Sequence, residues 1–233
     1  MGRPVVGVSL KMYFSLGRAR AWLQSAAAVV PDSVEFFVAP GYLAIADALA
    51  AFPSGAAAQD VSAEEPGPFT GEVSAAELAE AGVGYVEIGH AERRRLYGDT
   101  DEVVAAKMAV ALRHGLTPVL CVGETVDSPG AVDVAVRQVR SALDGAPPGR
   151  VLVAYEPVWA IGRAKPAPDD HIAAVCAALR SARREEHDAV IYGGSAGPGM
   201  LSRLGDAVDG IFLGRFAHDV AGLRAVLDEA AER

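Results

Sequence analysis

Eight short apolar segments, each followed by a stretch with helical spacing, recur along this chain of 233 residues. Near-continuous apolar strands are typical of a parallel sheet covered by helices. A repeated strand-then-helix order produces either an open sheet or a closed barrel, and eight units favour the barrel. The apolar segments are residues 5–10, 34–40, 56–61, 85–90, 117–123, 151–157, 189–195 and 210–215, and the helical patterns include 18–29, 75–81, 102–114, 132–143, 169–184 and 220–231.

The fold class that follows is α/β, with a (β/α)8 barrel as a single domain spanning residues 1–233. Barrels of this kind have ~250 residues, so the length fits. No Pro/Ser-rich linker or low-complexity run divides the chain.

The charge balance limits the class of partner. The chain has 21 Lys and Arg against 30 Asp and Glu, which gives a net charge of −9. We therefore expect neither nucleic acid nor an anionic membrane surface as a partner. An anionic small molecule would need a local positive site, because the overall field repels it.

Cys121 and Cys176 are the only cysteines, and they lie in different expected elements without metal-like spacing. This usage favours a reducing compartment and no metal site. The sequence opens directly into an apolar strand pattern, and no segment approaches the ~20 apolar residues of a membrane span. We expect a cytoplasmic protein.

Polar side chains stand where several expected strands end. Lys11 follows the first strand, His90 closes the fourth, Glu156 closes the sixth, and Ser195 follows the seventh. A single Glu or Lys at a strand end is more often a solvated loop residue. In a barrel, however, these ends meet on one face, where active sites are built. The convergence therefore predicts an active site at this face.

Seven segments of the chain resemble the triosephosphate isomerase family, in the family's order and over nearly the whole length. The resemblance implies a TIM barrel, aldose–ketose isomerisation of a small phosphorylated sugar, no cofactor, no metal and a homodimer. The segments are SLKMY (9–13), FTGEVS (69–74), GHAERR (89–94), CVGET (121–125), AYEPVWAIG (154–162), YGGSA (192–196) and DGIFLG (209–214).

The resemblance also implies a role for each catalytic candidate. Glu156 would be the base that moves a proton between two carbons, and His90, as neutral imidazole, would polarise the carbonyl. Lys11 would stabilise the developing negative charge, and Glu92 would support the pocket behind His90. Enediolate chemistry requires a carboxylate base, a positioned donor and a nearby cation.

Substrate phosphate is expected to bind backbone N–H groups of Gly162, Ser195 and Gly214, beside a short helix N-terminus after the last strand. Arg215 is either a phosphate ligand or a surface arginine that points away. The pattern leaves both interpretations open.

Residues 157–166 resemble the lid of the family, which closes over the substrate and excludes water. Ile161 and Phe212 match an apolar clamp around the base, and desolvation there should raise the pKa of Glu156.

The chain departs from the family pattern at several positions. Ser9 replaces a nearly constant Asn and leaves more room in the pocket. The other departures are Leu10 for Trp, Ala91 for Ser, Gly214-Arg215 for paired glycines, and Arg163-Ala164-Lys165-Pro166 at the lid tip.

These departures leave the substrate open. The overall match favours the triose phosphates dihydroxyacetone phosphate and glyceraldehyde 3-phosphate. Ser9 with Gly214-Arg215 resembles a branch that isomerises a four-carbon ketose phosphate, L-erythrulose 1-phosphate, in tetritol catabolism. A catalytically silent sugar-phosphate-binding barrel is disfavoured because Glu156, His90 and Lys11 are all present. An aldolase-like barrel lacks a candidate Schiff-base lysine.

The loop 64–72, EEPGPFTGE, resembles the segment that inserts into a neighbouring subunit near Lys11 in this family. We therefore expect a homodimer, with a simple acidic surface turn as the alternative interpretation.

Overall fold

The computed structural model describes residues 2–163, 165–185 and 188–233. In this described part, eight strands form one sheet in which every neighbouring pair is parallel, in the order β2-β1-β8-β7-β6-β5-β4-β3. The strands are β1 (Val5–Ser9), β2 (Glu35–Ala39), β3 (Ala57–Ala58), β4 (Tyr85–Ile88), β5 (Thr117–Val122), β6 (Leu152–Tyr155), β7 (Ala189–Tyr192) and β8 (Gly210–Leu213).

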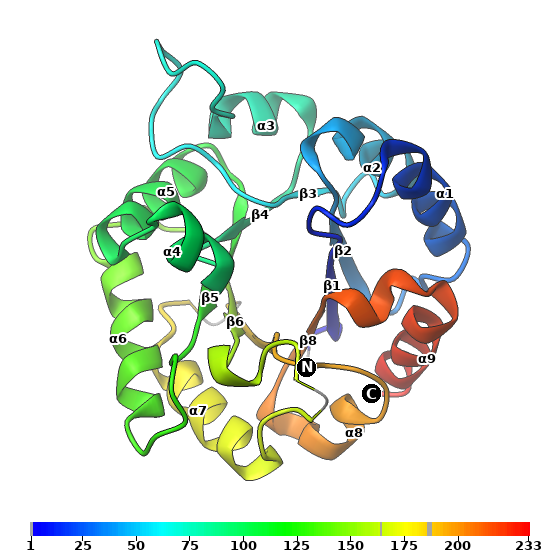
Figure 1. The fold of residues 1–233 in the computed structure, drawn as a ribbon, viewed down its shortest axis with the longest axis vertical. Helices are drawn as coiled ribbons and strands as arrows, with labels where there is room; N and C mark the ends of the chain where they lie inside the picture. The colour runs from blue at the N-terminus through cyan, green and yellow to red at the C-terminus, as the bar shows by residue number, and fades with distance from the viewer. Residues whose placement is uncertain (1, 164, 186–187) are drawn as a thin grey trace.

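The sheet nearly closes between β2 and β3, where a parallel bridge joins Val38 to Ala56. Helices surround the strands on the outside (Figure 1). The (β/α)8 barrel predicted from the sequence is therefore confirmed. The helices are α1 (Leu16–Ala27), α2 (Ile45–Ala51), α3 (Ala75–Ala81), α4 (Ala91–Tyr97), α5 (Asp101–Arg113), α6 (Ala131–Leu143), α7 (Asp169–Ala182), α8 (Met200–Leu204) and α9 (Val220–Ala231).

Each predicted apolar segment contains a strand, and the six predicted helices begin and end within two residues of the observed ones. The largest difference is β3, which has two residues although the pattern covers 56–61. Directly after the strand, the Gln59 side chain donates to the backbone oxygens of Lys11 and Ala39. The short helices α2, α4 and α8 were not among the predicted elements.

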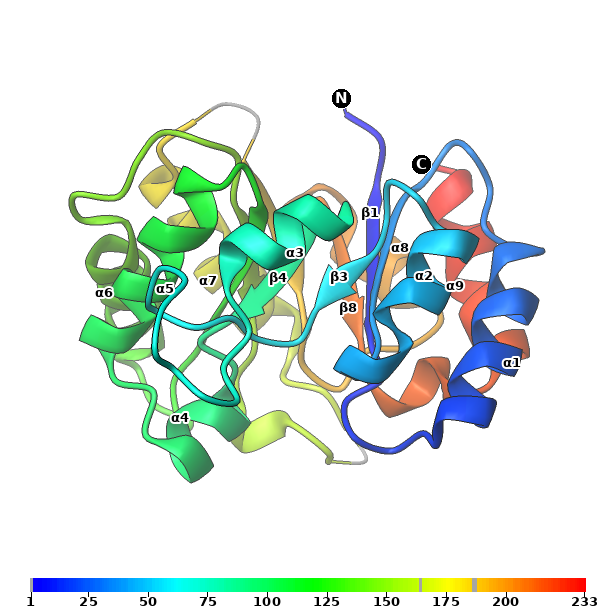
Figure 2. The ribbon, with the colours of Figure 1, turned by 90° about the horizontal axis from the view of Figure 1, so that it is seen from above.

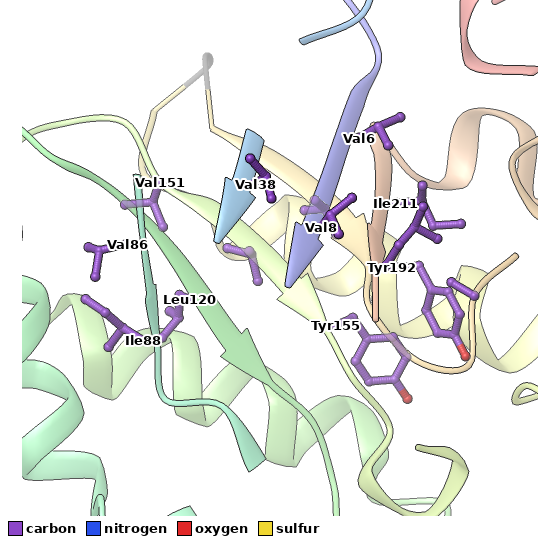
Figure 3. Packing of buried hydrophobic residues seen from close by; sticks show 14 of the residues in the cluster. Val6, Val8, Val38, Val86, Ile88, Leu120, Val151, Tyr155, Tyr192 and Ile211 are labelled. Carbon is purple, nitrogen blue, oxygen red and sulfur yellow. The ribbon is translucent and has the colours of Figure 1, made fainter. Parts of the chain in front are cut away.

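Alternating side chains of the strands pack into two separate apolar clusters. The outer cluster fills the space between strands and helices, and Figure 3 shows part of it, with Val86 and Ile88 on β4. The inner cluster fills the barrel interior, where the ring of Phe37 stacks on Tyr85 at 5.0 Å between centroids. Gly7 has no side chain because a Cβ there would lie 2.1 Å from the Phe37 ring.

The two ends of the barrel differ in what they carry. The N-terminus of the chain lies at one end, and α4 lies at the opposite end, where the strands finish (Figure 2). Short 3-10 helices, among them Val158–Ala160 and Arg215–His218, follow β6 and β8 at this second end. The strand ends therefore face an irregular polar surface there.

Both cysteines are buried and free. Among the described residues, none of the helices combines the length and apolar character that crossing a membrane requires. The single-domain interpretation of residues 1–233 stays a prediction.

Candidate active site

A cavity of about 760 Å³ opens at the carboxyl ends of the strands. Every site residue predicted from the sequence lines it, although these residues come from most of the length of the chain. They are Ser9, Lys11, His90, Glu92, Glu156, Gly162, Ser195, Gly214 and Arg215.

Glu156 follows β6, and the residue is 4% exposed. A Cβ at Gly193 would lie 2.8 Å from the carboxylate, so the glycine makes room for it. Within the described ranges, Glu156 Oε2 has no hydrogen-bond partner. Burial raises the pKa of Glu156 well above its usual value, and the neighbouring charge of Glu87 adds to the rise. The carboxylate is therefore a strong base aimed into the cavity.

His90 caps the N-terminus of α4, and its Nδ1 accepts a hydrogen bond from the Glu92 backbone N–H at 3.1 Å. Since Nδ1 is an acceptor, the neutral ring carries its proton on Nε2. Nε2 lies 3.5 Å from Glu156 Oε2. Burial lowers the pKa of His90 to about 4, and the charge of Lys11 contributes in the same direction. The ring is a neutral donor at physiological pH.

Lys11 follows β1 with a φ of 48°, the left-handed region that non-glycine residues rarely occupy. Its Nζ lies 2.7 Å from Glu92 Oε1. Burial alone would lower the pKa of Lys11, but the hydrogen bond and charge of Glu92, with the charges of Glu156 and Glu87, raise it overall. The ammonium therefore stays charged beside the cavity.

Sequence reasoning missed one carboxylate, Glu87, which lines the same cavity. The Ser9 hydroxyl donates to Glu87 Oε2 at 3.0 Å, and both residues are buried. The available signal was a charged residue inside the apolar run 85–90, at a position that alternates with outward-facing neighbours.

The loops after β6, β7 and β8 form the opposite rim of the cavity. The Ser195 hydroxyl donates to the Ala160 backbone oxygen at 2.8 Å, which connects the β7 loop to the lid segment. A Cβ at Gly162 would lie 3.3 Å from Arg215 Nη2. The Arg215 side chain is therefore directed toward the lid segment. The 3-10 helix that follows Gly214 is the short helix expected beyond the last strand.

The lid segment 157–166 is anchored at its start by a buried carboxylate that sequence reasoning also missed. Glu124 Oε1 accepts from Trp159 Nε1 at 2.6 Å, and both Glu124 oxygens accept from the Tyr155 hydroxyl. The predicted clamp residues Ile161 and Phe212 both line the cavity. Within the predicted lid tip, Ala164 lies outside the described residues.

Across the part of the chain that the structure describes, no group of three or more His, Cys, Asp or Glu side chains could hold a metal ion. The cavity instead brings together a raised-pKa carboxylate, a neutral imidazole donor and a cation. This set can take a proton from carbon and stabilise negative charge on oxygen.

Comparison with known proteins gives consistent relationships. The family model described as triosephosphate isomerase matches residues 4–230. An L-erythrulose-1-phosphate isomerase of Pectobacterium atrosepticum is 46% identical, over 97% of this chain and 95% of its own. A triosephosphate isomerase of Symbiobacterium thermophilum is 39% identical over 100% and 98%, respectively. An L-erythrulose-1-phosphate isomerase of Mesorhizobium japonicum is 36% identical over 97% and 96%.

Proposed function

The chain belongs to the triosephosphate isomerase family and is a sugar-phosphate isomerase, and we propose that its substrate is the four-carbon ketose phosphate L-erythrulose 1-phosphate. The observation that carries this choice is Ser9 at the cavity floor, where the family has the longer Asn. The 46% identity to a relative named for this substrate supports it. The choice reverses the order in which the sequence motifs rank the two substrates.

The chemistry follows from the structure of the substrate. L-erythrulose 1-phosphate is dihydroxyacetone phosphate with a hydroxymethyl group on the carbon distal to the phosphate ester. Glu156 takes the proton from C3, which lies next to the C2 carbonyl, and a C2–C3 enediolate forms. Return of that proton to C2, with movement of a proton from O3 to O2, leaves the carbonyl at C3. No atoms are gained or lost.

His90 and Lys11 stabilise the oxygens during this step. The Nε2–H of His90 donates to the carbonyl oxygen, and its neutral state keeps the imidazole a matched donor. Lys11 supplies a positive charge beside the developing oxyanion, and Glu92 positions Lys11 through their 2.7 Å contact. Such preorganised groups act strongly in a site from which water is excluded.

The phosphate is held at the rim made by the β6, β7 and β8 loops. Gly162, Ser195 and Gly214 line this part of the cavity, where their backbone N–H groups would donate to the phosphate, and Arg215 would add a guanidinium. Closure of segment 157–166 over the phosphate would exclude water, with Ile161 and Phe212 enclosing the Glu156 carboxylate.

Triose phosphate is the second candidate substrate. The family motifs of the catalytic centre are kept, and the 39% identity to a triosephosphate isomerase covers the whole chain. A catalytically silent barrel that only binds sugar phosphate is the least supported alternative, because binding alone does not require a buried carboxylate base next to a neutral imidazole.

The assembly we propose is a homodimer. Exposed apolar side chains lie on the loops after β1, β2 and β3, at one end of the barrel: Met12 is 96% exposed and Leu43 86%. Phe69, in the exposed segment 64–72 that reaches outward between β3 and α3 (Figure 1), adds to this surface. A monomeric mass in solution at micromolar concentration would refute the dimer.

A solvent-exchange experiment tests the function directly. The purified protein is incubated in D₂O with L-erythrulose 1-phosphate and, separately, with dihydroxyacetone phosphate, and deuterium at the carbon beside the carbonyl is followed by NMR. We expect incorporation with both substrates and a higher kcat/KM for the four-carbon one. A higher kcat/KM for dihydroxyacetone phosphate would assign the triose substrate, and no incorporation with either would refute the isomerase mechanism.

A further inference from the structure

Glu87 is an acidic side chain that points into the barrel interior. In β4, Tyr85 belongs to the inner cluster, while Val86 and Ile88 belong to the outer one. Because side chains alternate along a strand, Glu87 is directed inward with Tyr85. It is 4% exposed and lines the cavity that contains Glu156 and His90.

One oxygen of this carboxyl group is fixed by a residue from another strand of the barrel. Ser9 stands at the end of β1, is 3% exposed, and donates to Glu87 Oε2 at 3.0 Å. The other oxygen, Oε1, lies 3.9 Å from His90 Nε2. Oε1 is therefore near the place where a substrate oxygen must bind the imidazole.

In the described part of the chain, no lysine or arginine forms an ion pair with Glu87. A buried carboxyl group that is not paired with a cation is unfavourable, and burial raises the pKa of Glu87 to about 7. The inner cluster that includes its strand neighbour Tyr85 is apolar, so packing against these residues gives no reason for an acidic group here. A polar group of a bound ligand could supply the partner that the Glu87 carboxyl group lacks.

The proposed substrate supplies such a group at the right end. With the phosphate at the rim and C3 beside Glu156, the hydroxymethyl group of L-erythrulose 1-phosphate extends away from the phosphate, toward the floor formed by Ser9 and Glu87. We infer that the Glu87 carboxyl group binds the terminal hydroxyl of the four-carbon substrate, held in position by Ser9, and so determines substrate length. This inference rests on the proposed function.

The same geometry disfavours the shorter substrate. Dihydroxyacetone phosphate ends at C3 and lacks the C4 hydroxyl that would reach the floor, so Glu87 stays unpaired when it binds. A site built to bind a hydroxyl discriminates strongly against an analogue that lacks it, because its own polar groups are left without partners. Ser9 contributes twice, because it fixes Glu87 and leaves the space that the longer Asn would fill.

The test measures kcat/KM for L-erythrulose 1-phosphate and dihydroxyacetone phosphate in three variants. Glu87→Leu should lower kcat/KM for the four-carbon substrate roughly 10- to 100-fold, the loss expected for a hydrogen bond to an ionisable group. The value for dihydroxyacetone phosphate should fall less, so that the ratio of the two values falls. Ser9→Ala should shift the ratio in the same direction by about threefold to tenfold. Glu87→Gln, which keeps shape and polarity, should restore part of the discrimination.

Glu35→Gln is the matched control. Glu35 is also a mostly buried carboxylate on a strand of this barrel, but it stands at the start of β2, away from the cavity, and pairs with Arg150 and Tyr85. Its loss should leave the substrate ratio unchanged. Thermal melts of each variant verify that the measured protein is folded, and the ratio is independent of the fraction of active enzyme.

The outcomes separate the two proposals. Wild-type protein that prefers the four-carbon substrate, with a ratio unchanged in both Glu87 variants, overturns the role of Glu87 and leaves the proposed function standing. Wild-type protein that prefers dihydroxyacetone phosphate overturns the proposed substrate itself. A ratio that collapses only in Glu87→Leu and Ser9→Ala supports both.

Discussion

Two groups of buried charge in this barrel differ in how their charges are compensated. The first group, the ion-pair cluster, consists of Lys107, Arg93, Asp60 and Asp99. Lys107 Nζ lies 2.8 Å from carboxylate oxygens of both aspartates, and Arg93 Nε lies 2.8 Å from Asp60 and 3.2 Å from Asp99. Two cations thus face two carboxylates. Burial raises the pKa of Asp60 even so, while the hydrogen bond to Lys107 opposes the rise.

In the cavity cluster, three carboxylates face one cation and a neutral imidazole. Only Glu92 pairs directly with Lys11, while Glu156 and Glu87 are buried without a cation within ion-pair distance in the described structure. The cluster consists of Lys11, Glu87, His90, Glu92 and Glu156.

The difference indicates what each cluster is for. The ion-pair cluster joins α4, α5 and the segment after β3 through compensated charges, so its role is to stabilise the fold. The cavity cluster keeps raised-pKa carboxylates that the fold does not need. Strongly perturbed groups in a cleft are typical of functional sites. Substitutions should therefore separate the two clusters by what they damage.

The largest effect is expected for Glu156. Glu156→Gln removes the base and should lower kcat roughly a thousandfold, within the range of general acid–base catalysis. Glu156→Asp should lower it roughly a hundredfold, since a displacement near 1 Å can cost that much. Both are measured by steady-state kinetics. Because no lysine or arginine in the described structure lies within ion-pair distance of the buried carboxylate, Glu156→Gln should also raise the melting temperature. Near-normal turnover in either variant would mean that Glu156 is not the base.

The opposite pattern is expected for Lys107. Lys107→Met leaves Asp60 and Asp99 with a single cation and should lower the free energy of unfolding by about 3–5 kcal/mol. Chemical denaturation measures this loss. Turnover per folded molecule should change only a few-fold, because Lys107 does not line the cavity. A large loss of kcat in fully folded protein would contradict the division between the clusters.

The pH dependence of stability sharpens the comparison. The pKa of Glu87 rises from 4.5 to about 7 on folding, so the native state binds the proton more tightly than the unfolded state. The contribution of the Glu87 carboxyl group to the stability of the native state is full below pH 4.5 and is lost as the pH rises through 7. Glu87→Gln removes this dependence, so from pH 5 to pH 8 its stability should gain about 1–3 kcal/mol relative to wild type. If the difference in unfolding free energy between Glu87→Gln and wild type were the same at pH 5 and pH 8, the raised pKa of Glu87 would be refuted.

The smallest effect is expected at the rim. Arg215→Ala should raise KM for the phosphorylated substrate about tenfold with little change in kcat, because a charge-assisted contact to phosphate is lost. Inhibition by inorganic phosphate should weaken in parallel. Arg18→Ala, a change at another exposed arginine outside the cavity lining, serves as the control. Equal KM values in both variants would mean that Arg215 does not contact the phosphate.

Much of this architecture could be predicted because its signals are local. Strands such as 117–122 are short apolar runs, and helix starts such as Ser74, whose hydroxyl accepts from Glu77 N–H, follow from neighbouring residues. The short helix α4 was missed because its cap is His90, whose side chain is not a common N-cap. Strand β3 was predicted too long, since the apolar run continues to residue 61 while pairing with β4 stops at Ala58; the Gln59 side chain then contacts backbone oxygens that only the closed barrel brings near.

The sequence by itself determined the alternation of strands and helices, the family, and the residues at the strand ends, because each of these is written in spacing or in contiguous motifs. Tertiary structure alone decided that Ser9 meets Glu87, 78 positions away, and that Lys11 meets Glu92, 81 positions away. Those contacts exist because closing the sheet between β2 and β3 makes the ends of β1 and β4 face one small interior. The same closure removes water, and only there do the carboxylates of Glu87 and Glu156 acquire their raised pKa values.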